Sequence, residues 1–129
     1  MTNILKKIIK DKKETLNLIK KNNSLDSLER KIKTLNFFSN FKEAIINNKK
    51  ISLISEIKKA SPSAGILVKD FDHLNIAKMY IDNGATCLSV LTEEKYFLGK
   101  LDYILDIKKK FKKPILAKDF FIDPYQIAL

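Results

Sequence analysis

The residues best suited to chemistry are a glutamate and two lysines at the ends of expected strands. Glu56 and Lys58 stand two positions apart at the end of one apolar run, and Lys118 follows a later one. Side chains two apart on a strand point to the same face, so Glu56 and Lys58 are expected to lie together. Lysines in such a place can neutralise an anionic small molecule or donate a proton to it.

Two interpretations of these charges are open. In the first, Glu56 and Lys58 form an ion pair that only satisfies both charges, because an unpaired charge at a buried strand end is costly. In the second, Lys58 and Lys118 act on an anionic small molecule as charge partners or proton donors. Position and residue type do not distinguish the two interpretations.

The elements that must hold these residues alternate between strands and helices. Strands rich in β-branched and other apolar residues are expected over 51–57, 86–91 and 114–117, and helices over 73–83 and 101–111. Asp72 is the expected N-cap and Gly84 the expected C-terminal stop of the first of these helices, and Asp123-Pro124 opens another. Such alternation predicts right-handed βαβ units around a parallel sheet, and ligands bind at the carboxyl ends of its strands.

Residues 1–50 differ from the rest in their pattern of apolar residues and are expected to form a helical extension that packs on residues 51–129. The first 21 residues are apolar on one side and rich in lysine on the other, which predicts an amphipathic helix. A mitochondrial presequence would be rich in arginine and poor in acids, whereas Asp11 and Glu14 are present here. Ser24 is the expected cap of a second helix, and a third apolar cluster repeats at helical spacing: Phe37, Phe38, Phe41, Ala44 and Ile45.

Composition excludes several classes of protein. The 129 residues are 45% hydrophobic and 31% charged, and no apolar run approaches the roughly 18 residues of a membrane span. Cys87, the single cysteine, excludes a disulfide scaffold or a cysteine-built zinc site and is expected to be buried and inert. His73, the single histidine, is expected on the solvated surface and makes a histidine-built metal site or a Ser–His–Asp triad difficult to assemble.

The net charge of +10 first suggests nucleic acid, but 24 of the 25 basic residues are lysine. Recognition of bases and phosphates favours the bidentate fork of arginine, and Arg30 is the only one here. Most of the charge is therefore interpreted as solvated surface, and a basic nucleic-acid-associated protein is kept only as an alternative.

Several motifs occur together, in order, from about residue 4 to the end of the chain. They are residues 56–65 (EIKKASPSAG), 89–93 (SVLTE) with 96–99 (YFLG), 118–120 (KDF) with 123–127 (DPYQI), and the opening 4–8 (ILKKI). Together they resemble the indole-3-glycerol-phosphate synthase family. Separate motifs in register are a far stronger signal than one short pattern.

The resemblance implies a (β/α)8 TIM barrel of tryptophan biosynthesis in the cytoplasm, of which this chain would hold the first three βα units, the last one incomplete. The implied substrate is 1-(2-carboxyphenylamino)-1-deoxyribulose 5-phosphate, an anionic small molecule that closes to indole-3-glycerol phosphate with loss of carbon dioxide and water. No metal and no organic cofactor is implied. The implied partners include no membrane and no specific nucleic acid, while fusion to or association with other tryptophan-pathway domains is open.

The same resemblance implies roles for individual residues. Lys118 would be the general acid on the ketone oxygen, Lys58 would hold the carboxylate or phosphate of the substrate and serve in a later proton transfer, and Glu56 would position Lys58 and hydrogen-bond the ligand. Four further residues would line the substrate site, the two aromatic ones against the anthranilate ring: Ser61, Pro62, Phe97 and Phe120.

A complete barrel of this type has about 250 residues, so the 129 residues predict an incomplete chain that is inactive by itself. Its three strands would leave their inward faces open, with Ile54, Leu91 and Leu116 exposed. A non-catalytic remnant of a decayed gene is the alternative.

Overall fold

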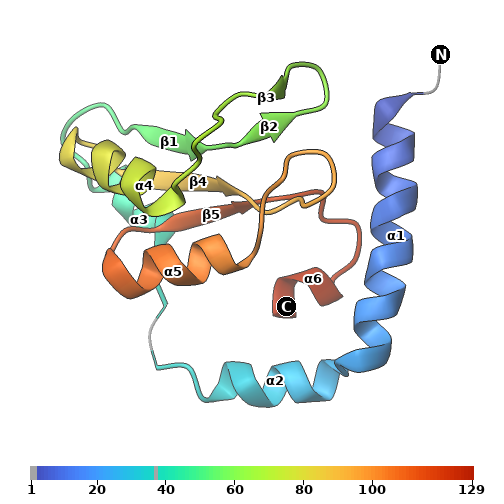
Figure 1. The fold of residues 1–129 in the computed structure, drawn as a ribbon. Coiled ribbons are helices and arrows are strands. Elements are labelled where there is room, and N and C mark those ends of the chain that lie inside the picture. The colour runs from blue at the N-terminus through green and yellow to red at the C-terminus, as the bar shows by residue number, and fades with distance from the viewer. Residues whose placement is uncertain (1–2, 37) are drawn as a thin grey trace. The chain divides into compact units, whose positions relative to one another are not determined.

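The computed structural model describes residues 3–36 and 38–129. The chain divides into two compact units, one made of Met1–Phe38 with Phe120–Leu129 and the other of Ser39–Asp119. Their elements are labelled in Figure 1. The domain division expected near residue 50 stays a prediction.

The second unit is built on a parallel sheet of three strands. They are β1 (Ile54–Ile57), β4 (Cys87–Leu91) and β5 (Ile115–Lys118), in the order β1-β4-β5. All five residues of β4 are buried, as expected for the central strand of a parallel sheet. The predicted mixed α/β arrangement with a parallel sheet is confirmed.

Two helices connect these strands and pack on one face of the sheet, as Figure 1 shows. They are α4 (His73–Asp82) and α5 (Asp102–Lys110). The core between sheet and helices consists of fully buried side chains from both layers: Ile57, Leu88 and Val90 from the strands, Ala77 from α4 and Ile107 from α5. Because side chains alternate along a strand, Glu56, Ser89 and Leu91 lie on the opposite face.

The predicted ends of α4 are confirmed. The Oδ1 atom of Asp72 accepts hydrogen bonds from the backbone N–H groups of Leu74 and Asn75, both at 3.0 Å. Gly84 follows the helix with a φ of 94°, a left-handed conformation that a residue with a side chain rarely adopts. The cap and the glycine thus define the two ends of α4.

Three expectations about local structure need correction. The run expected as a strand over 51–57 is a strand only from Ile54, and the loop after it contains an antiparallel hairpin of β2 (Ala60–Ser61) and β3 (Gly65–Ile66). The third helix, α3, spans only Phe41–Ile46, because the Oδ1 atom of Asn40 caps it through the N–H of Glu43. Phe38 precedes that helix and is exposed, and Phe37 lies outside the described residues.

The third correction concerns His73, which is not a solvated surface residue. Its side chain is only 18% exposed, its Nε2 atom lies 3.1 Å from Oδ2 of Asp106, and its ring stacks on Tyr103 with centroids 4.4 Å apart. These contacts join α4 to α5, so the histidine helps to dock one crossover helix on the other. Cys87, in contrast, is fully buried as expected, and burial raises the pKa of its thiol.

The first unit consists of α1 (Ile4–Asn22), α2 (Leu25–Lys33) and the short α6 (Tyr125–Ala128). Ser24 caps α2 as predicted, with its Oγ atom accepting from the N–H of Ser27 at 3.2 Å. Leu16 of α1, Leu28 of α2 and Tyr125 of α6 form a small buried core.

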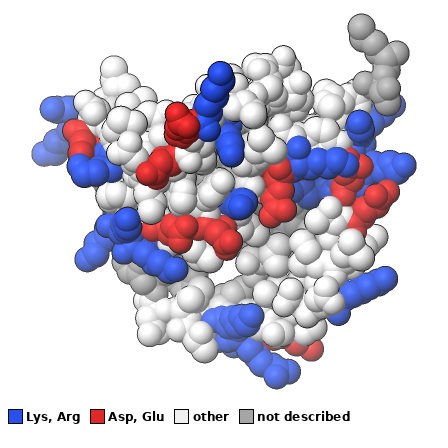
Figure 2. Space-filling view, in the orientation of Figure 1, with Lys and Arg blue, Asp and Glu red and all other residues white. Residues whose placement is uncertain are grey.

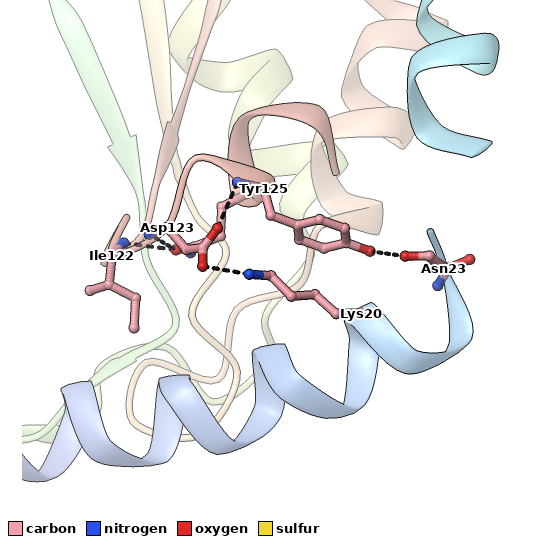
Figure 3. Close-up of polar contacts among 6 residues, drawn as sticks. Lys20, Asn23, Ile122, Asp123 and Tyr125 are labelled. Carbon is pink, nitrogen blue, oxygen red and sulfur yellow. Dashed lines mark hydrogen bonds and ion pairs between the residues drawn. The ribbon is translucent and has the colours of Figure 1, made fainter. Parts of the chain in front are cut away.

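Polar contacts in Figure 3 hold the end of α1 against the segment that leads into α6. Lys20 pairs with Asp123 at 2.5 Å, and the Tyr125 hydroxyl donates to the carbonyl of Asn23 at 2.7 Å. The Asp123 carboxylate also accepts from the N–H of Tyr125 at 2.9 Å, but the helix begins at Tyr125 with Pro124 rather than Asp123 at the N-cap position. The first unit thus joins residues from both ends of the chain.

In the part of the chain that the structure describes, no helix is long and apolar enough to cross a lipid bilayer.

Candidate active site

The structure brings Glu56, Lys58 and Lys118 together at the carboxyl ends of β1 and β5. The Nζ atom of Lys118 lies 2.6 Å from Oε2 of Glu56, and Nζ of Lys58 lies 3.0 Å from Oε1. Each carboxylate oxygen therefore has its own lysine. The Glu56 side chain is 29% exposed and that of Lys118 is 54% exposed, so the cations can reach solvent and a ligand can reach them.

Electrostatics keep Glu56 in its charged form. Partial burial raises the pKa of its carboxyl, but the hydrogen bonds and charges of Lys118 and Lys58 outweigh that effect and hold the pKa below its ordinary value. The three groups carry one net positive charge, so the cluster attracts an anion.

The ion pair between Lys118 and Glu56 crosses the central strand. Glu56 pairs in register with Ser89 of β4, and Leu91 of β4 pairs with Lys118 of β5. Because β1 and β5 are not neighbours in the sheet, the Lys118 side chain must extend over β4 to reach Glu56. The site is thus assembled across all three strands.

This crossing explains one wrong expectation about the inward face. Ile54 and Leu116 are exposed by 44% and 45%, as expected for an open face. Leu91 was expected to be exposed as well, but only 4% of its surface is accessible. It lies on the central strand, in register with Lys118 of β5.

Thr92, directly after β4, fixes the backbone that carries Lys118. Its N–H donates to the carbonyl of Lys118 at 3.0 Å, and its hydroxyl donates to Oδ2 of Asp119 at 2.9 Å. Its side chain is buried. The attachment of β4 to β5 therefore continues beyond the last pair of strand residues.

Glu93 holds the loop that carries Phe97, a structural role that the sequence reasoning missed. It is 5% exposed, and its carboxylate accepts from the backbone N–H groups of Lys95, Tyr96 and Phe97 at 3.3, 2.6 and 3.1 Å. It shapes the loop after β4 from inside.

Close packing ends this loop. Gly99 donates its N–H to the carbonyl of Glu93 at 2.8 Å, and a Cβ atom at Gly99 would lie 2.2 Å from the carbonyl oxygen of Leu91. Only glycine fits against that backbone.

The four residues expected to line the substrate site lie in different surroundings. Ser61 ends β2 and its Oγ atom accepts from the N–H of Ala64 at 3.2 Å, while Pro62 in the hairpin turn is exposed. Phe97 is half-buried in the Glu93 loop. Phe120 belongs to the first unit, where its carbonyl accepts from the side-chain amide of Gln126 at 3.0 Å.

The remaining charged side chains of the described residues form no metal cluster, and those in Figure 2 are of both signs. Within residues 3–36 and 38–129, no three His, Cys, Asp or Glu side chains are grouped so that they could hold a metal ion. Figure 2 shows Asp and Glu side chains among the Lys side chains of one face, which is the pattern of a mixed charged surface.

The family is shown by comparison with known proteins. The family model described as indole-3-glycerol phosphate synthase matches residues 5–129. The chain belongs to the indole-3-glycerol phosphate synthase family. This confirms the resemblance found in the motifs, and all of the predicted site residues fall within the matched range.

Individual relatives agree with this assignment. The chain is 44% identical over 124 residues to the indole-3-glycerol phosphate synthase of Desulforamulus reducens and 47% identical over 125 residues to that of Clostridium acetobutylicum, with 96% of this chain and 47% of each relative covered. It is also 46% identical over 128 residues to the tryptophan biosynthesis protein TrpCF of Buchnera aphidicola subsp. Diuraphis noxia, covering 98% of this chain and 27% of that protein. The chain spans about half the length of the indole-3-glycerol phosphate synthases that it matches.

Proposed function

We propose that this chain supplies the first part of a (β/α)8 barrel that acts in the cytoplasm as an indole-3-glycerol-phosphate synthase. Its substrate would be 1-(2-carboxyphenylamino)-1-deoxyribulose 5-phosphate, with no metal or organic cofactor. The observation that carries this proposal is the convergence of Lys118 and Lys58 on Glu56 at the carboxyl ends of parallel strands. Fusion to another tryptophan-pathway domain is part of the proposal, because one relative is a TrpCF protein.

Binding of the substrate would begin with charge. The substrate carries a phosphate and a carboxylate, and the cluster offers two lysines for one glutamate. Lys58 would hold one of the anionic groups of the substrate, since it is a compact point charge with three donors. Glu56 would keep Lys58 in place and accept a hydrogen bond from a substrate hydroxyl.

Lys118 would provide the general acid. As the carbon of the aromatic ring that bears the carboxylate attacks the ketone carbon, the electron pair of the C=O bond moves to its oxygen, which takes a proton from Nζ of Lys118. The C–CO2 bond then breaks and its electron pair restores the aromatic ring. The new hydroxyl then takes a proton and leaves as water, while the neighbouring CH2 carbon gives up a proton and its C–H electron pair forms the C=C bond of the indole; Lys58 serves in this proton transfer. The attachment of Thr92 to the Lys118 carbonyl supports this role, because it fixes the backbone from which the acid extends.

Four residues would form the wall of the site. Ser61 and Pro62 stand on the hairpin that follows β1, and Phe97 and Phe120 would pack against the anthranilate ring. The hydrogen bonds that shape the Glu93 loop support the choice of Phe97, because they fix the loop that carries it.

The test is turnover by the complete product of the gene, whose intact mass establishes which polypeptide is assayed. Formation of indole-3-glycerol phosphate is followed by its indole fluorescence in the wild type, Lys118→Ala and Lys78→Ala. Lys78 is a matched control, because it also pairs with a carboxylate, that of Asp82, on an exposed part of α4. We expect Lys118→Ala to lower kcat by at least about a hundredfold, in the range of a lost general acid, and Lys78→Ala to match the wild type.

Two results would refute the proposal. One is a wild-type product that forms no indole-3-glycerol phosphate and binds neither substrate nor product. The other is a wild type whose turnover survives Lys118→Ala unchanged.

A further inference from the structure

The hydroxyl of Ser89 is a buried polar group on the central strand of the sheet. Its side chain is only 4% exposed, and its Oγ atom has no hydrogen-bond partner among the described residues. Buried polar atoms are nearly always partnered, and leaving one unsatisfied destabilises the fold. A serine in such a position therefore calls for an explanation other than stability.

Its position in the sheet suggests that reason. Ser89 is the register partner of Glu56 on one side and of Leu116 on the other. Register partners on parallel strands present their side chains to the same face, and neighbouring strands lie about 4.8 Å apart. The hydroxyl therefore stands beside the Glu56 side chain, on the central strand that the Lys118 ion pair crosses.

The Glu56 carboxylate takes its side-chain hydrogen bonds from the two lysines of the site. Oε2 of Glu56 takes its hydrogen bond from Lys118, and Oε1 takes one from Lys58. When an anionic substrate draws either lysine away, one carboxylate oxygen loses a charge-assisted hydrogen bond. A half-buried carboxylate in that state needs another donor to keep its orientation.

We propose that Ser89 is a positioning residue whose hydroxyl donates to the Glu56 carboxylate once the substrate has drawn Lys118 away. This inference rests on the proposed function. Ser89 does not touch the reacting atoms; it keeps Glu56 in place while the lysines act on the substrate. Without substrate, the same hydroxyl has no hydrogen-bond partner among the described residues, which lowers the free energy of unfolding.

The test compares Ser89→Ala with Ser55→Ala in the complete gene product. Ser55 makes the control, because it lies on β1 one residue from Glu56 and its register partner Leu88 belongs to the core on the helix side of the sheet. Three experiments are made: the melting temperature is measured without ligand, kcat and KM are measured for the substrate, and the affinity is measured for indole-3-glycerol phosphate. The affinity measurement is repeated in the Glu56→Ala background.

We expect Ser89→Ala to leave the melting temperature equal or higher, because it removes an unsatisfied group. We expect it to lower kcat/KM and product affinity about ten- to a hundredfold, the worth of one hydrogen bond to a charged group. In the Glu56→Ala background the same substitution should change product affinity by less than about twofold, because the acceptor is gone. Ser55→Ala should leave kcat/KM unchanged.

Each other outcome decides against the inference. Stability and activity that fall together would mean that Ser89 only packs the sheet. Activity that stays at the wild-type level in Ser89→Ala would mean that its hydroxyl is unused, while the proposed function would stand. A wild type without turnover or ligand binding would refute the proposed function itself.

Discussion

Glu93 offers the sharpest test of how the loop after β4 is held. In Glu93→Gln, the amide oxygen can take the place of Oε2 and keep the N–H groups of Tyr96 and Phe97, which lie 2.6 and 3.1 Å from it. Both hydrogen bonds change from charge-assisted to neutral, at about 1 kcal/mol each. The amide nitrogen then faces the N–H of Lys95, but that contact is already long at 3.3 Å and adds little. The expected loss is about 2 kcal/mol.

The assay is urea unfolding followed by far-UV circular dichroism, with the free energy of unfolding compared between the wild type, Glu93→Gln and Glu94→Gln. Glu94 is the matched control, because it is the next residue in the same loop and is exposed. Its substitution should change the free energy of unfolding by less than about 0.5 kcal/mol. Amide hydrogen exchange should become faster at Tyr96 and Phe97 in Glu93→Gln only. If the two substitutions cost the same, or if Glu93→Gln costs less than about 0.5 kcal/mol, the buried carboxylate does not hold the loop.

Three further predictions concern the second unit. Glu56 has a lowered pKa in the folded state, so the stability that it contributes is complete above pH 4.5, its ordinary pKa, and is lost as the pH falls through the folded pKa. The difference in free energy of unfolding between the wild type and Glu56→Gln, measured in urea titrations, should therefore shrink below pH 4.5. A difference that stays constant would contradict this. The Cys87 thiol, fully buried and with a raised pKa, should react with an aromatic disulfide reagent only in denaturant, and rapid labelling of the native chain would show the β4 core to be open. Ile107→Ala, at a fully buried position of α5, should cost about 2–5 kcal/mol in urea unfolding, whereas Leu105→Ala on the exposed side of the same helix should cost about 0.5 kcal/mol; equal costs would contradict the assignment of the core face.

The alternation of strands and helices was predictable because apolar runs and helix caps are local signals. Asp72 and Gly84 act within a few residues of their own positions, and their roles follow from residue type. The convergence of Glu56 and Lys118 was predictable only in part. The sequence indicates that both stand at carboxyl ends of strands, but the strand order β1-β4-β5 decides that Lys118 must cross the central strand.

What the sequence did not reveal depends on contacts between distant residues or on loop geometry. The expectation that Leu91 is exposed was wrong, because the residue lies on the central strand and its register partner, Lys118, comes from a strand 27 positions later in the chain. His73 was expected in solvent because its partner, Asp106, lies 33 positions away on another helix, and no local sequence pattern indicates that contact. Glu93 was missed because three backbone donors, which have no sequence signature, give it its role.

Because the Lys118–Glu56 ion pair crosses β4, the distance between its two residues depends on the curvature of the sheet. Its two ends belong to strands that share no backbone hydrogen bonds, so their separation is set by how strongly β1 and β5 coil around the central strand. That coiling is set in turn by the packing of Ile57, Leu88 and Val90 on the opposite, helix-covered face. A change of one methylene in that core alters the angle between strands and hence the distance over which the lysine must reach. Residues of the core on the helix-covered face therefore influence the distance between Lys118 and Glu56 through the shape of the sheet.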